Sequence, residues 1–170
     1  MDHVIKLLET YRNRGLLLDT NLLLLFVVGE CDIRAVQTFK RTKIFAIEDF
    51  YLLQKFVRHF AKIVTTPNVL TEVSSFLNQL PDAIKAQHFQ QFSRAIQTFD
   101  EKHAESARLA VMPLFLRFGL TDSGILAEAK GKYLVLTDDF KLSSYLQSLH
   151  VDVINFNHVR TYNWNISAPV

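Results

Sequence analysis

Short apolar runs and longer stretches of mixed polarity follow one another along the chain. An apolar run bounded by glycine or polar residues is typical of a strand buried on both faces, because neither face meets water. Runs of this kind predict strands at residues 16–18, 63–64, 133–136 and 151–154.

Between these runs, apolar residues recur at every third or fourth position, which is the spacing of one helix face. Thr66 followed by Pro67 is typical of a helix start, and Thr121 is expected to cap a helix that stops at Gly131. Helices are predicted over residues 2–13, 48–61, 67–77, 82–99, 104–118 (restarted or kinked at Pro113), 121–130 and 139–149, and another is predicted to begin after residues 19–21.

The alternation of strands with helices predicts an α/β protein in which helices flank a parallel sheet. The 170 residues are enough for one domain, and 49% of them are hydrophobic, which is ample for a packed core. The formal net charge of +2 is compatible with binding to a polyanion but too small to indicate it.

Cys31 is the only cysteine, which excludes a disulfide within the chain and a cysteine-rich zinc site. The first residues do not have the pattern of a signal peptide, and the apolar stretch 15–29 is too short to span a bilayer. We therefore expect a soluble, cytoplasmic protein that does not contact a membrane.

Acidic residues follow several of the predicted strands. Asp19 comes directly after the run 16–18, and Asp138 and Asp139 come after the run 133–136. Glu72 lies in the first turns of the helix after 63–64, and Asp122 lies beside the expected cap of a later helix. Because sites in parallel sheets gather beyond the carboxyl ends of the strands, these carboxylates are expected at one edge of the sheet.

Carboxylates that lie close together repel one another, and a bound cation relieves that repulsion. A donor set made only of oxygen suits Mg²⁺ or Mn²⁺ better than zinc. Such an ion can orient and activate water and can stabilise charge that develops on a phosphodiester. The acidic set therefore indicates phosphoryl chemistry.

Each acid also has an ordinary structural interpretation. Asp19 and the pair Asp138–Asp139 are residues of the type that caps a helix or favours its dipole. Asp122 is a normal residue for a helix start, and Glu72 alone would be an exposed charge on a helix. The functional interpretation depends on whether the fold brings the carboxylates together.

Four segments of the chain, in this order, carry a resemblance to a known family. They are Gly15-Leu-Leu-Leu-Asp19-Thr-Asn21, Thr66-Pro-Asn-Val-Leu-Thr-Glu72-Val, Phe118-Gly-Leu-Thr121-Asp122-Ser-Gly-Ile-Leu-Ala and Tyr133-Leu-Val-Leu-Thr137-Asp138-Asp139-Phe-Lys-Leu142. Together they resemble the PIN-domain nucleases, the group that includes VapC-type toxins and several RNA-processing enzymes. Each motif is weak alone, whereas four in the expected order are specific.

The resemblance implies a three-layer α/β/α fold with a central, mainly parallel sheet, and a Mg²⁺- or Mn²⁺-dependent endoribonuclease. It assigns metal binding to four acids and supporting catalytic roles to their neighbours. The implied metal ligands are Asp19, Glu72, Asp122 and Asp139, and the other implied catalytic residues are Asn21, Thr137 near the scissile phosphate, and Asp138, which could share or replace the role of Asp139.

The chain also departs from the compact toxins of that family. Residues 1–14 are an added helical element, and an insert is expected within about 29–61 of a single domain that spans residues 1–170. The family setting implies an RNA substrate, an inhibitory antitoxin-like protein partner and a homodimer. A toxin of a toxin–antitoxin or phage-defence module is the setting that we expect.

Residues 33–47 contain Arg34, Lys40, Arg41 and Lys43 and no acidic residue. They could form a nucleic-acid-binding edge that contacts phosphates, or an ordinary solvated loop. Two alternatives to a ribonuclease remain: an RNA-binding or scaffold subunit without turnover, and a structure-specific DNA nuclease.

Overall fold

The centre of the protein is a parallel sheet with strand order β3-β2-β1-β4-β5, in a computed structural model that describes residues 2–161. The strands are β1 (Leu16–Leu18), β2 (Ile63–Thr65), β3 (Asp100–Glu101), β4 (Leu134–Thr137) and β5 (Val153–Asn155). In the central strand, Leu17 is in register with Val64 of β2 and with Val135 of β4. Every residue of β1, β2, β4 and β5 is buried, so both faces of the sheet are covered.

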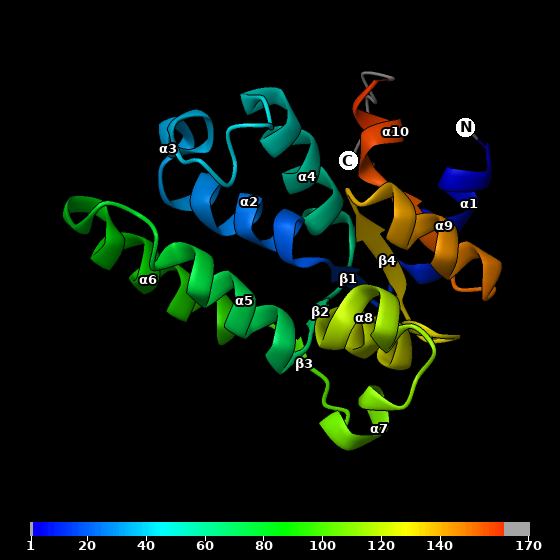
Figure 1. The fold of residues 1–170 in the computed structure, drawn as a ribbon. Coiled ribbons are helices and arrows are strands. Elements are labelled where there is room, and N and C mark those ends of the chain that lie inside the picture. The colour runs from blue at the N-terminus through cyan, green and yellow to red at the C-terminus, as the bar shows by residue number, and fades with distance from the viewer. Residues whose placement is uncertain (1, 162–170) are drawn as a thin grey trace.

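Helices lie in front of and behind this sheet (Figure 1), which completes a three-layer α/β/α architecture. They are α1 (Asp2–Tyr11), α2 (Thr20–Cys31), α3 (Ile33–Thr38), α4 (Ile47–His59), α5 (Pro67–Leu77), α6 (Asp82–Ile96), α7 (Ser106–Ala110), α8 (Phe115–Ala129), α9 (Phe140–Ser148) and α10 (Phe156–Arg160). The predicted fold class is therefore confirmed, and every pair of neighbouring strands is parallel.

Helix α2 is the most deeply buried helix of the described chain. It packs against α5 and α6, against α3 and α4, and against β4. Leu22, Leu23, Leu24 and Leu25 are all at most 1% exposed, because neighbours surround the helix on all sides. This position holds the start of α2 rigidly at the end of β1, which is where Asp19 lies.

Several of the predicted boundaries differ from those of the structure; for example, the strand expected over 151–154 is β5, Val153–Asn155. The helix expected over 82–99 ends at Ile96, because Asp100–Glu101 pairs with β2 as strand β3. The helix expected over 104–118 consists of the short α7 and the start of α8. Part of the basic segment 33–47 is helical, as α3. Strands β2 and β4 each continue to a threonine, one residue beyond the expected end.

Helix α8 contains a break at Gly119, in the interval between the helices expected over 104–118 and 121–130. Gly119 has φ 82° and ψ −168°, a conformation that favours glycine, and the helix resumes after it. Thr121 does not act as the expected helix cap. It lies inside α8, and its hydroxyl donates to the carboxylate of Glu72. The break turns the second half of α8 so that Thr121 and Asp122 face the end of β1.

Among residues 2–161, none of the helices has the length and apolar character that a membrane crossing requires.

Candidate active site

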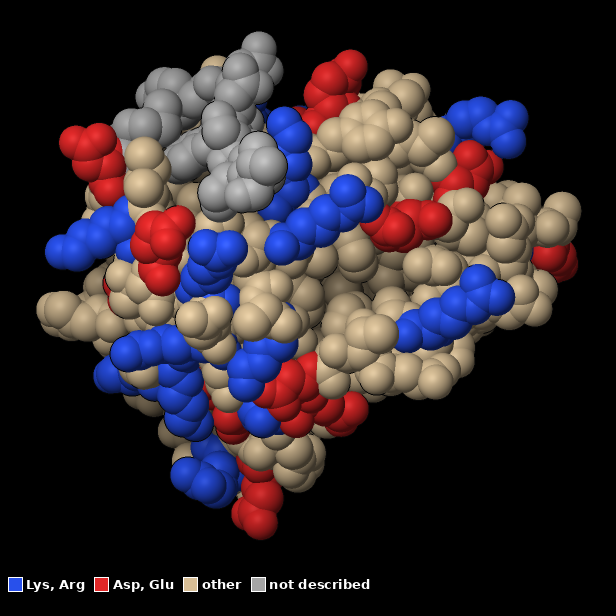
Figure 2. All heavy atoms as spheres, turned by 180° about the vertical axis from the view of Figure 1, so that it is seen from behind, with Lys and Arg blue, Asp and Glu red and all other residues tan. Residues whose placement is uncertain are grey.

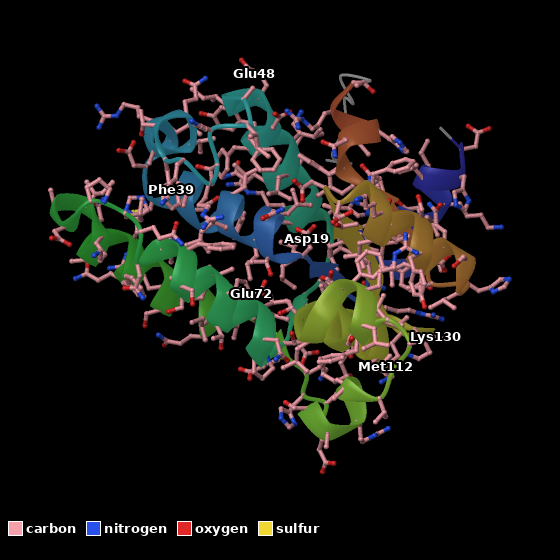
Figure 3. All side chains as sticks on the ribbon, viewed as in Figure 1. Asp19, Phe39, Glu48, Glu72, Met112 and Lys130 are labelled. Atoms are coloured by element: carbon pink, nitrogen blue, oxygen red, sulfur yellow. The ribbon has the colours of Figure 1, made fainter. Side chains whose placement is uncertain are left out.

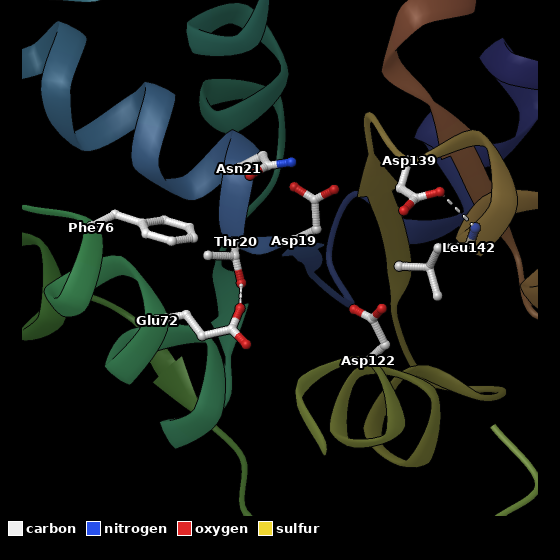
Figure 4. A pocket seen from close by; sticks show the side chains of 8 residues that line it. All are labelled: Asp19, Thr20, Asn21, Glu72, Phe76, Asp122, Asp139 and Leu142. Carbon is white, nitrogen blue, oxygen red and sulfur yellow. Dashed lines mark hydrogen bonds between the residues drawn. The ribbon is translucent and has the colours of Figure 1, made fainter. Parts of the chain in front are cut away.

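A pocket of about 150 Å³ lies beyond the carboxyl ends of β1 and β4. Its lining residues come from four separate parts of the chain and converge as Figure 4 shows: Asp19, Thr20, Asn21, Glu72, Phe76, Asp122, Asp139 and Leu142. The structure thus brings all four predicted metal-ligand carboxylates to one cavity. Asp19 and Glu72 lie near the middle of the molecule (Figure 3).

Asp19 sits at the junction of β1 and α2 and is 5% exposed. Its Oδ1 accepts from the backbone N–H of Leu22 (2.9 Å), so it is the N-cap of α2, as its structural interpretation predicted. Its Oδ2 accepts from the hydroxyl of Thr137 and from the backbone N–H of Asp138 (3.0 Å). Asp19 therefore caps α2 and lines the pocket with the same side chain.

The pKa of Asp19 lies well above its ordinary value. Burial is the largest cause, and the negative charge of Asp138 adds to it. The hydrogen bonds from Thr137, Leu22 and Asp138 act in the opposite direction, because they stabilise the carboxylate. A carboxylate that is buried at this position is ionised more easily when a cation is nearby.

The other three predicted catalytic residues lie at or beside the pocket: Asn21 lines it, whereas Thr137 and Asp138 do not. Thr137 is fully buried; its hydroxyl donates to Asp19 and accepts from the backbone N–H of Asp139 (3.0 Å). Asp138 accepts from the amide of Asn21 (3.0 Å) and is outside the pocket lining, whereas Asn21 is in the lining. The geometry favours Asp139 over Asp138 as the fourth carboxylate of the cavity.

Glu72 projects from α5, and two threonine hydroxyls hold its carboxylate. Thr20 donates to Oε2 (2.8 Å), and Thr121 donates to Oε1 (2.6 Å). These bonds join the start of α2 and the segment of α8 that follows Gly119 to α5. The predicted start of α5 is confirmed, because Thr66 caps it through Val69 and Pro67 occupies its first turn.

Asp122 lies in the second half of α8, and its pKa is raised to about 7. Burial is the largest cause, followed by the negative charges of Glu72 and Asp139. Among the described residues, its carboxylate takes part in no hydrogen bond or ion pair with another side chain. The carboxylate of Asp122 is therefore repelled by two other pocket carboxylates, and no hydrogen bond from another side chain of the described residues offsets that repulsion.

Asp139 caps α9 and lines the pocket at the same time. Its Oδ1 accepts from the backbone N–H groups of Lys141 (2.6 Å) and Leu142 (2.9 Å), which leaves Oδ2 for another partner. The structural interpretation of this acid as a helix cap is correct, and the cap fixes where the carboxylate lies.

The donor chemistry of the pocket fits a hard divalent cation, because all four acidic side chains offer carboxylate oxygens. The raised pKa values of Asp19 and Asp122 are what such a cation would reverse. In the present side-chain positions, no group of three or more His, Cys, Asp or Glu within residues 2–161 is arranged to hold a metal ion. Each oxygen of Glu72 accepts one threonine hydroxyl and keeps a second lone pair that could coordinate a cation.

The four predicted cations of residues 33–47 differ in their positions. The guanidinium of Arg34 lies 3.3 Å from the carboxylate of Asp32, so that charge is partly neutralised. Lys40 and Lys43 are exposed. Arg41 lies over the ring of Phe76, which lines the pocket. Lys and Arg side chains also gather on the rear face (Figure 2), so the basic surface is not confined to this segment.

Sequence reasoning missed three residues of the lining. Thr20 follows Asp19 directly, and Leu142 lies three positions after Asp139. Phe76 lies one helical turn after Glu72 on α5, so the spacing of four residues was a signal that both side chains share a helix face. This ring was not distinguishable from a core aromatic by its sequence neighbours alone.

Compared with family models, with curated proteins and with solved structures, the chain has no match in any of the three.

Proposed function

We propose that this protein is a Mg²⁺- or Mn²⁺-dependent endonuclease that hydrolyses the phosphodiester bonds of RNA. The observation that carries the proposal is the convergence of Asp19, Glu72, Asp122 and Asp139 in one pocket at the carboxyl end of a parallel sheet. The resemblance of the four motifs to PIN-domain nucleases supports the same chemistry. It also supports RNA as the substrate.

In this proposal, the four carboxylates hold the cation. When bound, the cation activates water and stabilises the charge that develops on the phosphodiester. Asp19 is held by Thr137 and by the backbone of Asp138, so it keeps its place when a ligand enters. The hydroxyls of Thr20 and Thr121 would orient Glu72 toward the cation, since each carboxylate oxygen can accept a hydrogen bond and still coordinate a metal.

Asp122→Asn is the sharpest test, because it removes a pocket charge without removing a helix cap. Asp19→Asn would also set an amide against the N–H of Asp138, so loss of activity there could reflect misfolding. We expect Asp122→Asn to reduce RNA cleavage in Mn²⁺ by about 100-fold or more, the effect of losing several kcal/mol of transition-state stabilisation. Circular dichroism checks that the fold is retained.

Asp82→Asn at the start of α6 is the matched control, since it removes one exposed carboxylate outside the pocket. It should cleave at the rate of the unchanged chain. EDTA should stop cleavage, and DNA of the same sequence distinguishes a ribonuclease from a DNA nuclease. Full activity of Asp122→Asn, or cleavage that persists in EDTA, contradicts the proposal, and RNA binding without turnover in Mn²⁺ indicates a binding subunit.

A further inference from the structure

Arg41 is fixed against α5 at the edge of the acidic pocket. Its guanidinium carbon lies 4.4 Å from the centre of the Phe76 ring. Its Nε donates to the side-chain oxygen of Gln79 (3.0 Å), just beyond the end of α5. A cation–π contact and a hydrogen bond together hold an arginine that is otherwise exposed.

Phe76 connects this arginine to the pocket. Its ring is part of the lining, one turn along α5 from Glu72 (Figure 4). Arg41 is thus separated from the acidic cavity by a single aromatic side chain. Arg34, by contrast, is turned toward Asp32, so Arg41 is the better placed of the two guanidinium groups.

A phosphodiester that approaches four carboxylates meets unfavourable charge, and a cation at the rim offsets it. A guanidinium binds phosphate through parallel N–H groups, and only Nε of Arg41 is used by another side chain within residues 2–161. Because the ring and Gln79 already restrict the guanidinium, less conformational entropy is lost when it binds.

We propose that Arg41 and Phe76 form a subsite for single-stranded RNA beside the acidic pocket. The guanidinium of Arg41 binds a phosphate next to the cleaved one, and the ring of Phe76 contacts an unpaired base. Bases inside a duplex are stacked on each other and cannot reach such a ring, so the subsite selects single strands. This inference rests on the proposed nuclease function of the pocket.

The experiment measures binding separately from cleavage. A short fluorescein-labelled single-stranded RNA is titrated with the full chain in EDTA, and binding is followed by fluorescence anisotropy. We expect Arg41→Ala to weaken binding by about tenfold and to reduce the slope of log K against log salt by about 1. Arg12→Ala is the matched control. It removes the same charge from an exposed residue that precedes β1, at the amino ends of the strands and away from the pocket.

Two further variants separate the stacking contact from the charge. Phe76→Leu keeps an apolar side chain and the net charge but removes the aromatic ring. It should weaken binding of the single strand by about tenfold while leaving binding of duplex RNA unchanged. Arg41→Lys should keep the salt slope of the unchanged chain but only part of its affinity. Lysine keeps the charge but lacks the planar group that stacks on the ring and binds phosphate through two N–H groups.

Equal binding by the Arg41→Ala and Arg12→Ala chains, or undetectable binding by the unchanged chain, overturns the subsite. An equal effect of Phe76→Leu on single strands and duplexes overturns the selection of single strands. Cleavage in Mn²⁺ is measured on the same chains. If the unchanged chain cleaves and Arg41→Ala binds normally, only the subsite fails; if Arg41→Ala binds weakly but no chain cleaves, only the nuclease function fails.

Discussion

At the side chain of Asp122, burial and the charges of Glu72 and Asp139 raise the pKa to about 7. A carboxyl group whose pKa is higher in the folded chain than in the unfolded chain favours folding when it is protonated. Its contribution is therefore complete below the unfolded pKa, near 4, and is lost as the pH rises through about 7. The metal-free protein is expected to become less stable over that interval.

Replacement of Asp122 by Asn removes this loss, because the amide does not ionise. In EDTA at about pH 8, we expect Asp122→Asn to raise the free energy of unfolding by about 1–2 kcal/mol, and the difference should shrink toward about pH 5. Urea denaturation at several pH values measures it. A difference that is absent, or that grows toward low pH, contradicts the assigned pKa. Asp82→Asn serves as the control, since its exposed carboxylate has a lowered pKa caused by Lys85.

At the scale of elements, the C-terminal part of α2 lies very close to α4. Gly29 on α2 lies directly beneath the ring of Phe50 on α4. A Cβ atom at this glycine would stand 2.2 Å from Cδ2 of that ring. The two helices could not pack at their present separation with any larger residue there.

Gly29→Ala is therefore expected to destabilise the protein, although alanine is the better helix former. The overpacked contact should lower the free energy of unfolding by about 1–3 kcal/mol. The midpoint of urea denaturation measures the change. Adding Phe50→Leu should return part of the loss by making room for the new methyl group. If Gly29→Ala stabilises the chain, the close packing of α2 on α4 is wrong.

The sequence was informative where an element has a strong local signal. The strands at 16–18 and 63–64, the helix start at Thr66-Pro67 and the helix that follows Asp139 were all predictable, because apolar runs and capping residues mark them. Strand β3 was not, since Asp100–Glu101 is short and acidic and gains its strand conformation only by pairing with β2. The break at Gly119 falls in the gap between the two predicted helices, but the role of Thr121 was not predictable, because its contact with Glu72 depends on tertiary packing.

The acidic site was predictable as a set, but the roles of its members were not. Strand ends placed Asp19 and Asp139 at one edge, which the structure confirms as their location. Periodicity could not show that Thr20 and Thr121 hold Glu72, because these contacts join positions far apart in the chain. Nor could it distinguish Arg41 from Lys40 and Lys43, since tertiary packing alone sets Arg41 over Phe76.

At the scale of the whole molecule, the pocket joins the sheet to α2, α5, α8 and α9. These elements belong to one hydrophobic core that extends from Leu7 to Val159. A cation bound by all four carboxylates would stabilise only the folded chain, since unfolding separates its ligands. Metal binding should therefore be visible as a change in global stability.

Mn²⁺ or Mg²⁺ is accordingly expected to raise the Tm, and EDTA to reverse the increase. At about one hundred times its Kd the cation stabilises by about 2.7 kcal/mol, which corresponds to about 5–10 °C for a protein of this size. Differential scanning fluorimetry measures the shift, which should be smaller in Asp122→Asn and unchanged in Asp82→Asn. No shift in the unchanged chain at any concentration contradicts a metal site in the pocket.

The order of the four pocket acids along the chain, from Asp19 to Asp139, has a consequence for proteolysis. A cut at any peptide bond between those two residues divides the carboxylates between two fragments. Neither fragment can carry the complete pocket, whichever bond is cut. A protease that opens one surface turn therefore leaves activity only as long as the two pieces stay together, so the nicked protein loses its chemistry by dissociating rather than by losing a residue.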